Sequence, residues 1–332
     1  MRDIAIVPTG TDDAPVEDYR DHPPASDVDL GYGVSIERLS EDDYKLMMAA
    51  CLPRGHFFFG VPQWGQRYAF VRRVNLDIYR AHPYGWDEDH VLSSAIALSR
   101  LVRDNAHCTD FAGRLVDHED CEQQVIPLGG FESRLAYRYG RERDWLDAAD
   151  AAELRTLLDR FIQIEPAWPS RVRLGIRNCE RASQTPFLTE SQPRLVTGLE
   201  ALLSTSTHHV SKQFRERVRA LAGELGIRGV SGGLLDRMYD FRSKAYHGDE
   251  IHLISGDPDN QPEIAVQHRQ LVKEAALFQH VLRGTVRKAI EDDAFRSVFE
   301  EDDRVRQRWP VAVRARFRDR LFGRARTSSK SL

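Results

Sequence analysis

Cysteine is scarce in this chain, and long apolar runs are missing. The 332 residues include four cysteines, too few and too scattered for a disulfide scaffold: Cys51, Cys108, Cys121 and Cys179. Reduced thiols and a cytoplasmic location are therefore expected. No apolar run approaches the length of a membrane span, and the N-terminus lacks the extended apolar core of a signal peptide. We expect a cytoplasmic protein that does not enter a membrane.

Recognisable metal and nucleotide motifs are also missing. His107 and Cys108, together with His118 and Cys121, come nearest to a metal site, but they show neither Cys-x2-Cys nor His-x3-His spacing. Gly31-Tyr-Gly33 lacks the third glycine and the strand–turn–helix frame of a dinucleotide site, and no lysine-bearing phosphate loop is present. We expect no bound metal and no cofactor, with zinc held by the His and Cys pairs as the alternative.

Charge is nearly balanced overall but unevenly distributed. The formal net charge of −4 argues against a protein that coats nucleic acid. Residues 11–29 are acidic, whereas residues 304–332 hold ten basic residues and a single acidic one, Asp319. Aromatic residues interleave with these charges, so the tail could follow a phosphate backbone and stack bases; the alternative is a solvated tail with a few apolar anchors. The candidate RNA-binding residues are Arg314, Arg316, Arg318, Arg320, Arg324 and Arg326.

The N-terminal half predicts a mixed α/β domain of no family that we recognise. Residues 1–35 have adjacent prolines and little periodicity, which indicates a poorly ordered lead. Within residues 36–184, Ser40 begins a capping box, and residues 68–76 are typical of a strand. Helical stripes follow at residues 91–102, 154–161 and 172–182. Two more strands are expected at residues 111–115 and 125–128, with Gly129-Gly130 as a turn.

Four amphipathic helices are predicted between residues 185 and 303. Apolar residues recur there at three- and four-residue steps, and polar or glycine-bearing loops separate the helices. This pattern favours a four-helix bundle of ordinary domain size. The overall fold class is therefore α+β, mainly helical, with the bundle following the mixed domain and a basic tail at residues 304–332. The four stripes are Leu195, Val196, Leu199, Leu202 and Leu203; Val210, Phe214, Val218 and Leu221; Leu234, Leu235, Met238, Phe241 and Ala245; and Val266, Leu271, Ala275, Phe278, Leu282 and Val286.

The third of these helices ends in an arginine and a histidine, Arg242 and His247, just before Gly248. An arginine can hold a phosphate, and a histidine can move a proton near neutral pH, so the two together could cleave RNA without a metal. A chain with 12 His and many arginines contains about one such spacing by chance, so the surroundings carry the argument. Arg242 lies on the edge of the apolar stripe, and Gly248 is suited to end the helix. On the alternative interpretation, Arg242 forms a surface ion pair and His247 is an ordinary C-terminal helix residue.

Residues 186–295, approximately, resemble the HEPN superfamily, and within it the Apea-like HEPN domains of bacterial defence proteins. The resemblance rests on the four-helix order, on Leu195-Val-Thr-Gly-Leu-Glu-Ala-Leu-Leu203 and on Tyr239-Asp-Phe-Arg-Ser-Lys-Ala-Tyr-His-Gly248. HEPN domains carry an R-x(4–6)-H motif, whose Arg and His form a metal-independent ribonuclease site at a dimer interface in active members. The resemblance assigns these roles to Arg242 and His247. Many active members have Asn, Asp or His after the arginine, whereas this chain has Ser243, which looks like the Apea-like variant.

The resemblance implies a metal-independent endoribonuclease of a bacterial antiphage defence or toxin system, with RNA as substrate and a homodimer formed through the C-terminal bundle. Glu200, Ser243 and Tyr246 are candidate supporting residues. The carboxylate of Glu200 would orient Arg242 or His247, unless it faces solvent. By analogy, the N-terminal domain would bind an unknown trigger or restrain the nuclease. The alternatives are a noncatalytic HEPN module for dimerisation or signalling and an RNA-binding protein without turnover.

Overall fold

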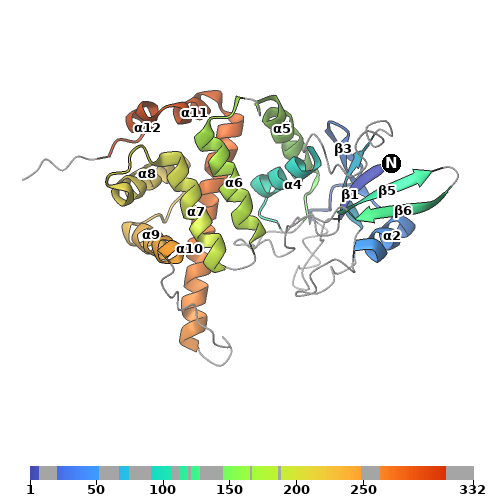
Figure 1. Ribbon diagram of the computed structural model, residues 1–332, viewed down its shortest axis with the longest axis horizontal. Helices are drawn as coiled ribbons and strands as arrows, with labels where there is room; N and C mark the ends of the chain where they lie inside the picture. Colours follow the sequence, from blue (N-terminus) through green and yellow to red (C-terminus); the bar gives the residue numbers. More distant parts are fainter. Residues whose placement is uncertain are drawn as a thin grey trace, which may run out of the picture.

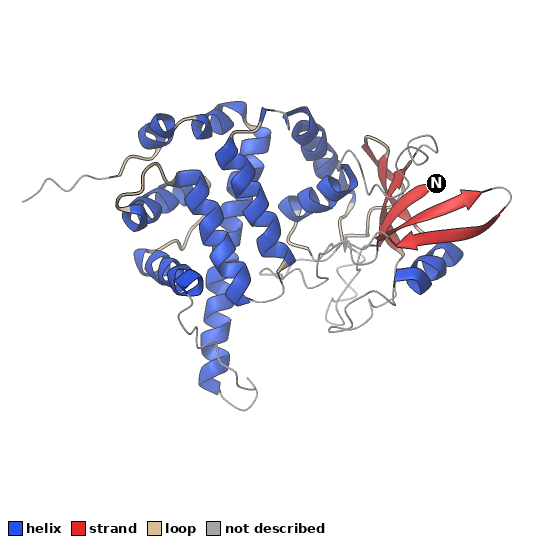
Figure 2. Ribbon diagram, viewed as in Figure 1, coloured by secondary structure: helices blue, strands red, loops and turns tan. Residues whose placement is uncertain are grey.

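The protein is mainly helical, with one small antiparallel sheet, which confirms the α+β prediction (Figure 1). The computed structural model describes residues 1–6, 21–51, 67–74, 91–105, 112–118, 121–127, 145–164, 167–185, 188–247 and 262–311. Figure 2 shows that the strands gather at one end of the molecule and that helices make up most of the rest. Among the helices of these ranges, none has the length and apolarity that crossing a membrane would require.

Six antiparallel strands form the sheet in the order β2-β3-β4-β1-β5-β6. The N-terminal strand β1 lies between β4 and β5, with Ile4 paired to Val71 on one side and to Gly113 on the other. The strands are β1 (Arg2–Ile6), β2 (Val28–Gly31), β3 (Val34–Arg38), β4 (Tyr68–Arg73), β5 (Ala112–His118) and β6 (Cys121–Pro127).

The two faces of the sheet are covered by different helices. Ile4 and Ile6 of β1 pack on one face with Met47 of α2 (Glu41–Cys51), whereas Ala5 joins the larger core on the other face, where α4 (Val91–Val102) and α5 (Ala148–Ile164) lie. Gly113 allows α2 to come close, because a Cβ at this position would lie 3.1 Å from Met47 Cε. Ser40 caps α2 as predicted, since its Oγ accepts a hydrogen bond from the Asp43 backbone N–H at 3.1 Å.

The remaining helices form the second half of the molecule around α7. Leu195, Leu199 and Leu202 of α7 are fully buried, as their spacing predicted. α7 contacts the helices before and after it, namely α6, α8, α9 and α10. The helices are α6 (Ser170–Gln184), α7 (Leu188–Leu203), α8 (Val210–Glu224), α9 (Gly232–His247), α10 (Pro262–Glu291), α11 (Asp293–Ser297), η4 (Val298–Glu300) and α12 (Asp302–Arg308).

The four predicted stripes are largely buried, but Val266 is an exception, with 58% of its surface exposed. Figure 1 shows the reason: the first turns of α10 extend beyond the helices that cover the rest of it. The stripe prediction was therefore wrong at Val266 and right from Ala275 onward, where Phe278 and Leu282 are buried.

The predicted poorly ordered lead needs correction. Arg2–Ile6 forms a central strand, and Val28–Gly31 forms an edge strand of the sheet. The Arg114 guanidinium holds β1 through two hydrogen bonds to the Asp3 carboxylate, at 2.6 and 2.9 Å, in a buried pair. This pairing partner lies more than a hundred residues away, so no local pattern could indicate it. Residues 7–20 lie outside the described part of the chain.

The domain boundary expected near residue 184 falls between two helices that pack closely. A Cβ on Gly175 of α6 would lie 3.1 Å from Leu202 of α7, so the two backbones approach one another. One hydrophobic core includes residues from both sides, such as Val172 and Leu199. The described helices on either side of residue 184 therefore share a core, and the division there stays a prediction. The expected turn at Gly129-Gly130 lies outside the described residues, and β5 and β6 are joined earlier, across residues 119–120.

Candidate functional site

The candidate site lies where α9 packs against α7, because this contact brings Arg242 to Glu200. Arg242 Nη2 donates a hydrogen bond to Glu200 Oε2 at 2.7 Å. The side chains of Arg242 and Glu200 are 26% and 15% exposed, so the ion pair is accessible from one side. The solvent-facing alternative for Glu200 is therefore wrong: its carboxylate faces α9.

Arg242 keeps donors that Glu200 does not use. Its Nε is buried and lacks a hydrogen-bond partner among the described residues. Its guanidinium lies over the ring of Tyr246, with 5.0 Å between Cζ and the ring centroid. A guanidinium contacted on one side by a carboxylate and on another by an aromatic ring is held in one orientation.

Tyr239 and Thr197 extend the site, and both were missed in the sequence. The Tyr239 hydroxyl lies 3.5 Å from Glu200 Oε1 as a long hydrogen bond, and Thr197 Oγ1 donates to the Tyr246 hydroxyl at 3.4 Å. Burial, and then the charge of Glu200, raise the pKa of Tyr239 above its ordinary value, so it stays a protonated donor at neutral pH. Residues three before and four after Arg242 share its helix face, so the spacing alone could have identified Tyr239 along with Tyr246.

His247 is the last residue of α9, and its side chain lies outside the described part of the structure. By ideal helical geometry its Cα is rotated about 140° from that of Arg242 around the axis. Ser243, four residues before His247, is half-buried on α9. The structure thus places Arg242, Glu200 and Tyr246 together, while the geometry of Arg242 relative to His247 stays a prediction.

Ion pairs to three neighbouring helices hold α9 in place. Besides the Glu200–Arg242 pair to α7, Arg237 Nη2 contacts Glu274 of α10 at 2.5 Å. Asp236 pairs with Arg215 of α8. α9 is therefore linked by ion pairs to α7, α8 and α10.

Within the residues that the structure describes, the candidate metal ligands do not come together as a cluster. Across the ranges that the structure describes, no group of three or more His, Cys, Asp or Glu residues is arranged to hold a metal ion. His118 and Cys121 are opposite one another in the β5–β6 pairing, but their side chains and residues 106–111, including His107 and Cys108, lie outside the described part.

The predicted basic tail begins later than residue 304. Trp309 is buried against Phe295 and Phe299, and its indole N–H donates to Glu224 Oε2 at 3.2 Å. Arg308 Nη2 donates to the same glutamate at 2.8 Å. Residues 304–309 therefore dock on the helices, so the expected start of the basic tail at residue 304 was wrong, whereas the buried Trp309 is an apolar anchor of the kind that the alternative expected. The arginines proposed to bind RNA, from Arg314 to Arg326, lie outside the described residues.

No family model, no curated protein and no solved structure matches this chain.

Proposed function

We propose that this protein is a metal-independent endoribonuclease of the HEPN type, acting in a bacterial antiphage defence or toxin system. The observation that supports the proposal is the Glu200–Arg242 pair, which orients a partly exposed arginine five residues before the C-terminal histidine of α9. A phosphate-binding guanidinium needs such orientation if it is to stabilise charge in a transition state.

The proposed reaction uses the substrate's own 2′-hydroxyl. The 2′-oxygen attacks the adjacent phosphorus, and the bond from phosphorus to the 5′-oxygen breaks. His247 takes up the proton of the 2′-hydroxyl or delivers a proton to the leaving 5′-oxygen. Arg242 stabilises the negative charge that develops on the phosphoryl oxygens, and Glu200 acts through Arg242 as a positioning residue. The products carry a 2′,3′-cyclic phosphate and a 5′-hydroxyl.

RNA cleavage by purified full-length protein, in the presence of EDTA, tests the proposal. His247→Ala and Arg242→Ala should each reduce cleavage by about a hundredfold to ten-thousandfold, because each removes a group that acts in the transition state. Lys244→Ala is the matched control, because Lys244 is an exposed cation on the same helix. Full activity of both site variants, or no cleavage of any RNA by the wild-type protein, would contradict the proposal.

The proposed homodimer forms through the C-terminal helices. Two residues with large exposed apolar surfaces lie there: Tyr246 of α9 is 54% exposed, and Val266 lies on the part of α10 that extends outward. A two-fold axis near α9 would bring together two sites, each of which has a single arginine and a single histidine. Light scattering at micromolar concentration should give twice the monomer mass, and a fully active monomer would contradict this part of the proposal.

A noncatalytic HEPN module is the second candidate, and one observation favours it. The contacts of Arg242 with Glu200 and Tyr246 also serve as a structural link between α7 and α9. In that case Arg242→Ala lowers stability, and the wild-type protein leaves RNA intact. If RNA is bound without being cleaved, the protein is an RNA-binding protein without turnover.

A further inference from the structure

A cavity of about 240 Å³ lies between α4, α5, α6 and α10, lined by residues of all four helices. Leu98, Leu101 and Phe161 supply an apolar wall. Because a water molecule occupies about 30 Å³ in the liquid, the cavity has room for about eight groups of that size. This volume suits a short organic chain or a single ring with one head group.

Two buried arginines line the same cavity. Arg100 of α4 is 4% exposed and Arg283 of α10 is 9% exposed. Within the described residues, Arg283 has no carboxylate in ion-pair distance, its Nε has no hydrogen-bond partner, and its contact to the Leu101 carbonyl is long at 3.5 Å. A buried cation without a counter-charge destabilises the folded protein. An anion in the cavity would supply the missing partner.

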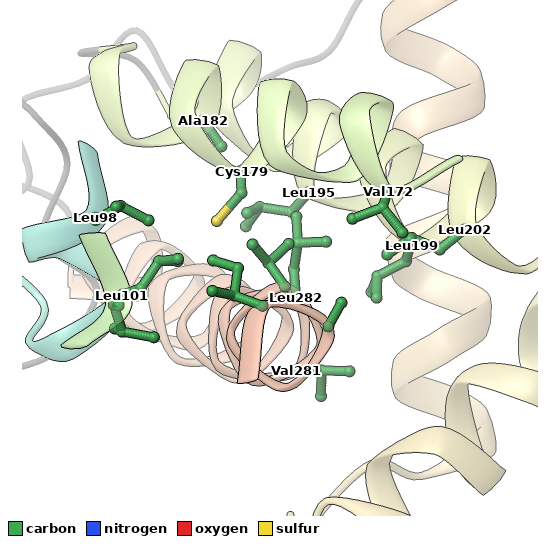
Figure 3. Close-up of a cluster of buried hydrophobic side chains, with 14 of the residues drawn as sticks. Leu98, Leu101, Val172, Cys179, Ala182, Leu195, Leu199, Leu202, Val281 and Leu282 are labelled. Atoms are coloured by element: carbon green, nitrogen blue, oxygen red, sulfur yellow. The ribbon is translucent and has the colours of Figure 1, made fainter. Parts of the chain in front are cut away.

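The other polar groups near the cavity do not supply a counter-charge to Arg283. Glu180 lines the cavity opposite α10, and Asp104 lies nearby, where it accepts a hydrogen bond from Gln279 at 3.0 Å. Cys179 also lines the cavity, and Figure 3 shows its sulfur pointing from α6 toward the space between α4 and α10. Burial raises the pKa of this thiol to about 12, so Cys179 stays neutral and adds no negative charge.

We infer that this cavity binds a small organic anion, with a carboxylate or phosphate head group on Arg283 and an apolar body against Leu98, Leu101 and Phe161. The inference is separate from the proposed ribonuclease activity, because the cavity and the Glu200–Arg242 pair share no residue. The head group forms charge-assisted hydrogen bonds with Arg283, which are the stronger kind in a buried site. The apolar wall selects against bare inorganic anions.

Calorimetric titration of the full-length protein tests the inference with three probes of equal chain length: octanoate, octyl phosphate and octanol. We expect at least one of the two anions to bind at least tenfold more tightly than octanol, and the tighter anion identifies the head group. Arg283→Met should weaken the binding of that anion on the order of thirtyfold, because it removes one partner of a buried charge pair. Arg269→Met, which removes an exposed cation from the same helix, should bind like the wild-type protein.

A second variant separates loss of binding from loss of folding. Ala97 lines the cavity from α4, so Ala97→Leu occupies part of the cavity without changing any charge and should also weaken anion binding. Equal affinity for octanol and both anions would overturn the inference, as would wild-type protein that binds none of the probes. An Arg283→Met variant that keeps the wild-type affinity for the anions would overturn it too.

Discussion

Removing either member of the Glu200–Arg242 pair should destabilise the protein, and the two losses should not add. A hydrogen bond between charged groups contributes about 1.5–3 kcal/mol when it is well shielded, whereas exposed ion pairs contribute about 0.2–1 kcal/mol. The 2.7 Å contact belongs to the stronger kind, but the 26% exposure of Arg242 calls for a discount. We therefore expect a coupling free energy of about 1 kcal/mol between Glu200→Ala and Arg242→Ala.

Urea unfolding of the two single variants and the double variant measures this coupling. Arg242→Ala should be the costlier single change, because it leaves the more buried partner, the Glu200 carboxylate, without its counter-charge and also removes the contact with the Tyr246 ring. The matched cycle uses Glu200→Ala with Lys244→Ala, where additive losses are expected because Lys244 is exposed. Additivity within about 0.3 kcal/mol in the Glu200–Arg242 cycle would refute the reasoning, since independent sites behave in that way.

Two further predictions concern the C-terminal segment that docks on the helices, and a third concerns the residues that follow it. Trp309→Ala should lower the free energy of unfolding by about 3–5 kcal/mol, because it empties a buried aromatic site; a loss below about 1 kcal/mol in urea would contradict the docking. Hydrogen bonds from Arg308 and Lys288 lower the pKa of Glu224, although burial opposes them. The ionised Glu224 carboxylate therefore stabilises the protein at pH values above the ordinary glutamate pKa, and this stabilisation is lost as the pH falls below that value. Glu224→Gln should therefore flatten the stability profile below about pH 4.5, and an unchanged acid limb would exclude this role. Truncation after Val311 should weaken RNA binding and reduce its salt dependence, while leaving the fold intact; equal affinity and an equal salt slope would rule out an RNA-binding tail.

Most of the helical half could be predicted from the sequence, because burial along a helix repeats within a few residues. Leu195, Leu199 and Phe278 show this pattern, and each is buried. The sheet could be predicted only in part. The strand at Tyr68–Arg73 lies in a segment rich in aromatic and β-branched residues, but nothing near Arg2–Ile6 shows that it pairs with two strands from much later in the chain.

For the candidate site, too, the local features could be predicted from the sequence and the contacts between distant segments could not. Arg242 lies at the edge of its stripe, as expected, and its position follows from helical spacing. Its contact with Glu200 depends on how α7 and α9 pack, and the sequence left the direction of Glu200 open. For Trp309 the sequence allowed an apolar anchor within the basic tail, but the surface that buries the indole and the Glu224 carboxylate that holds Arg308 depend on how the helices pack.

The candidate site and the cavity are linked by one close contact between α7 and α10. A Cβ at Gly198 would lie 2.8 Å from Leu282 Cδ2, so the glycine lets α10 approach α7. Leu282 precedes Arg283 of the cavity, and Gly198 lies two residues before Glu200. Because packed interiors leave little free space, a displacement of α10 at this point must be taken up by α7. An anion bound to Arg283 would therefore lie one residue away from a tight contact with the helix that carries Glu200. By linkage, any effect of the anion on RNA affinity must appear equally as an effect of RNA on anion affinity.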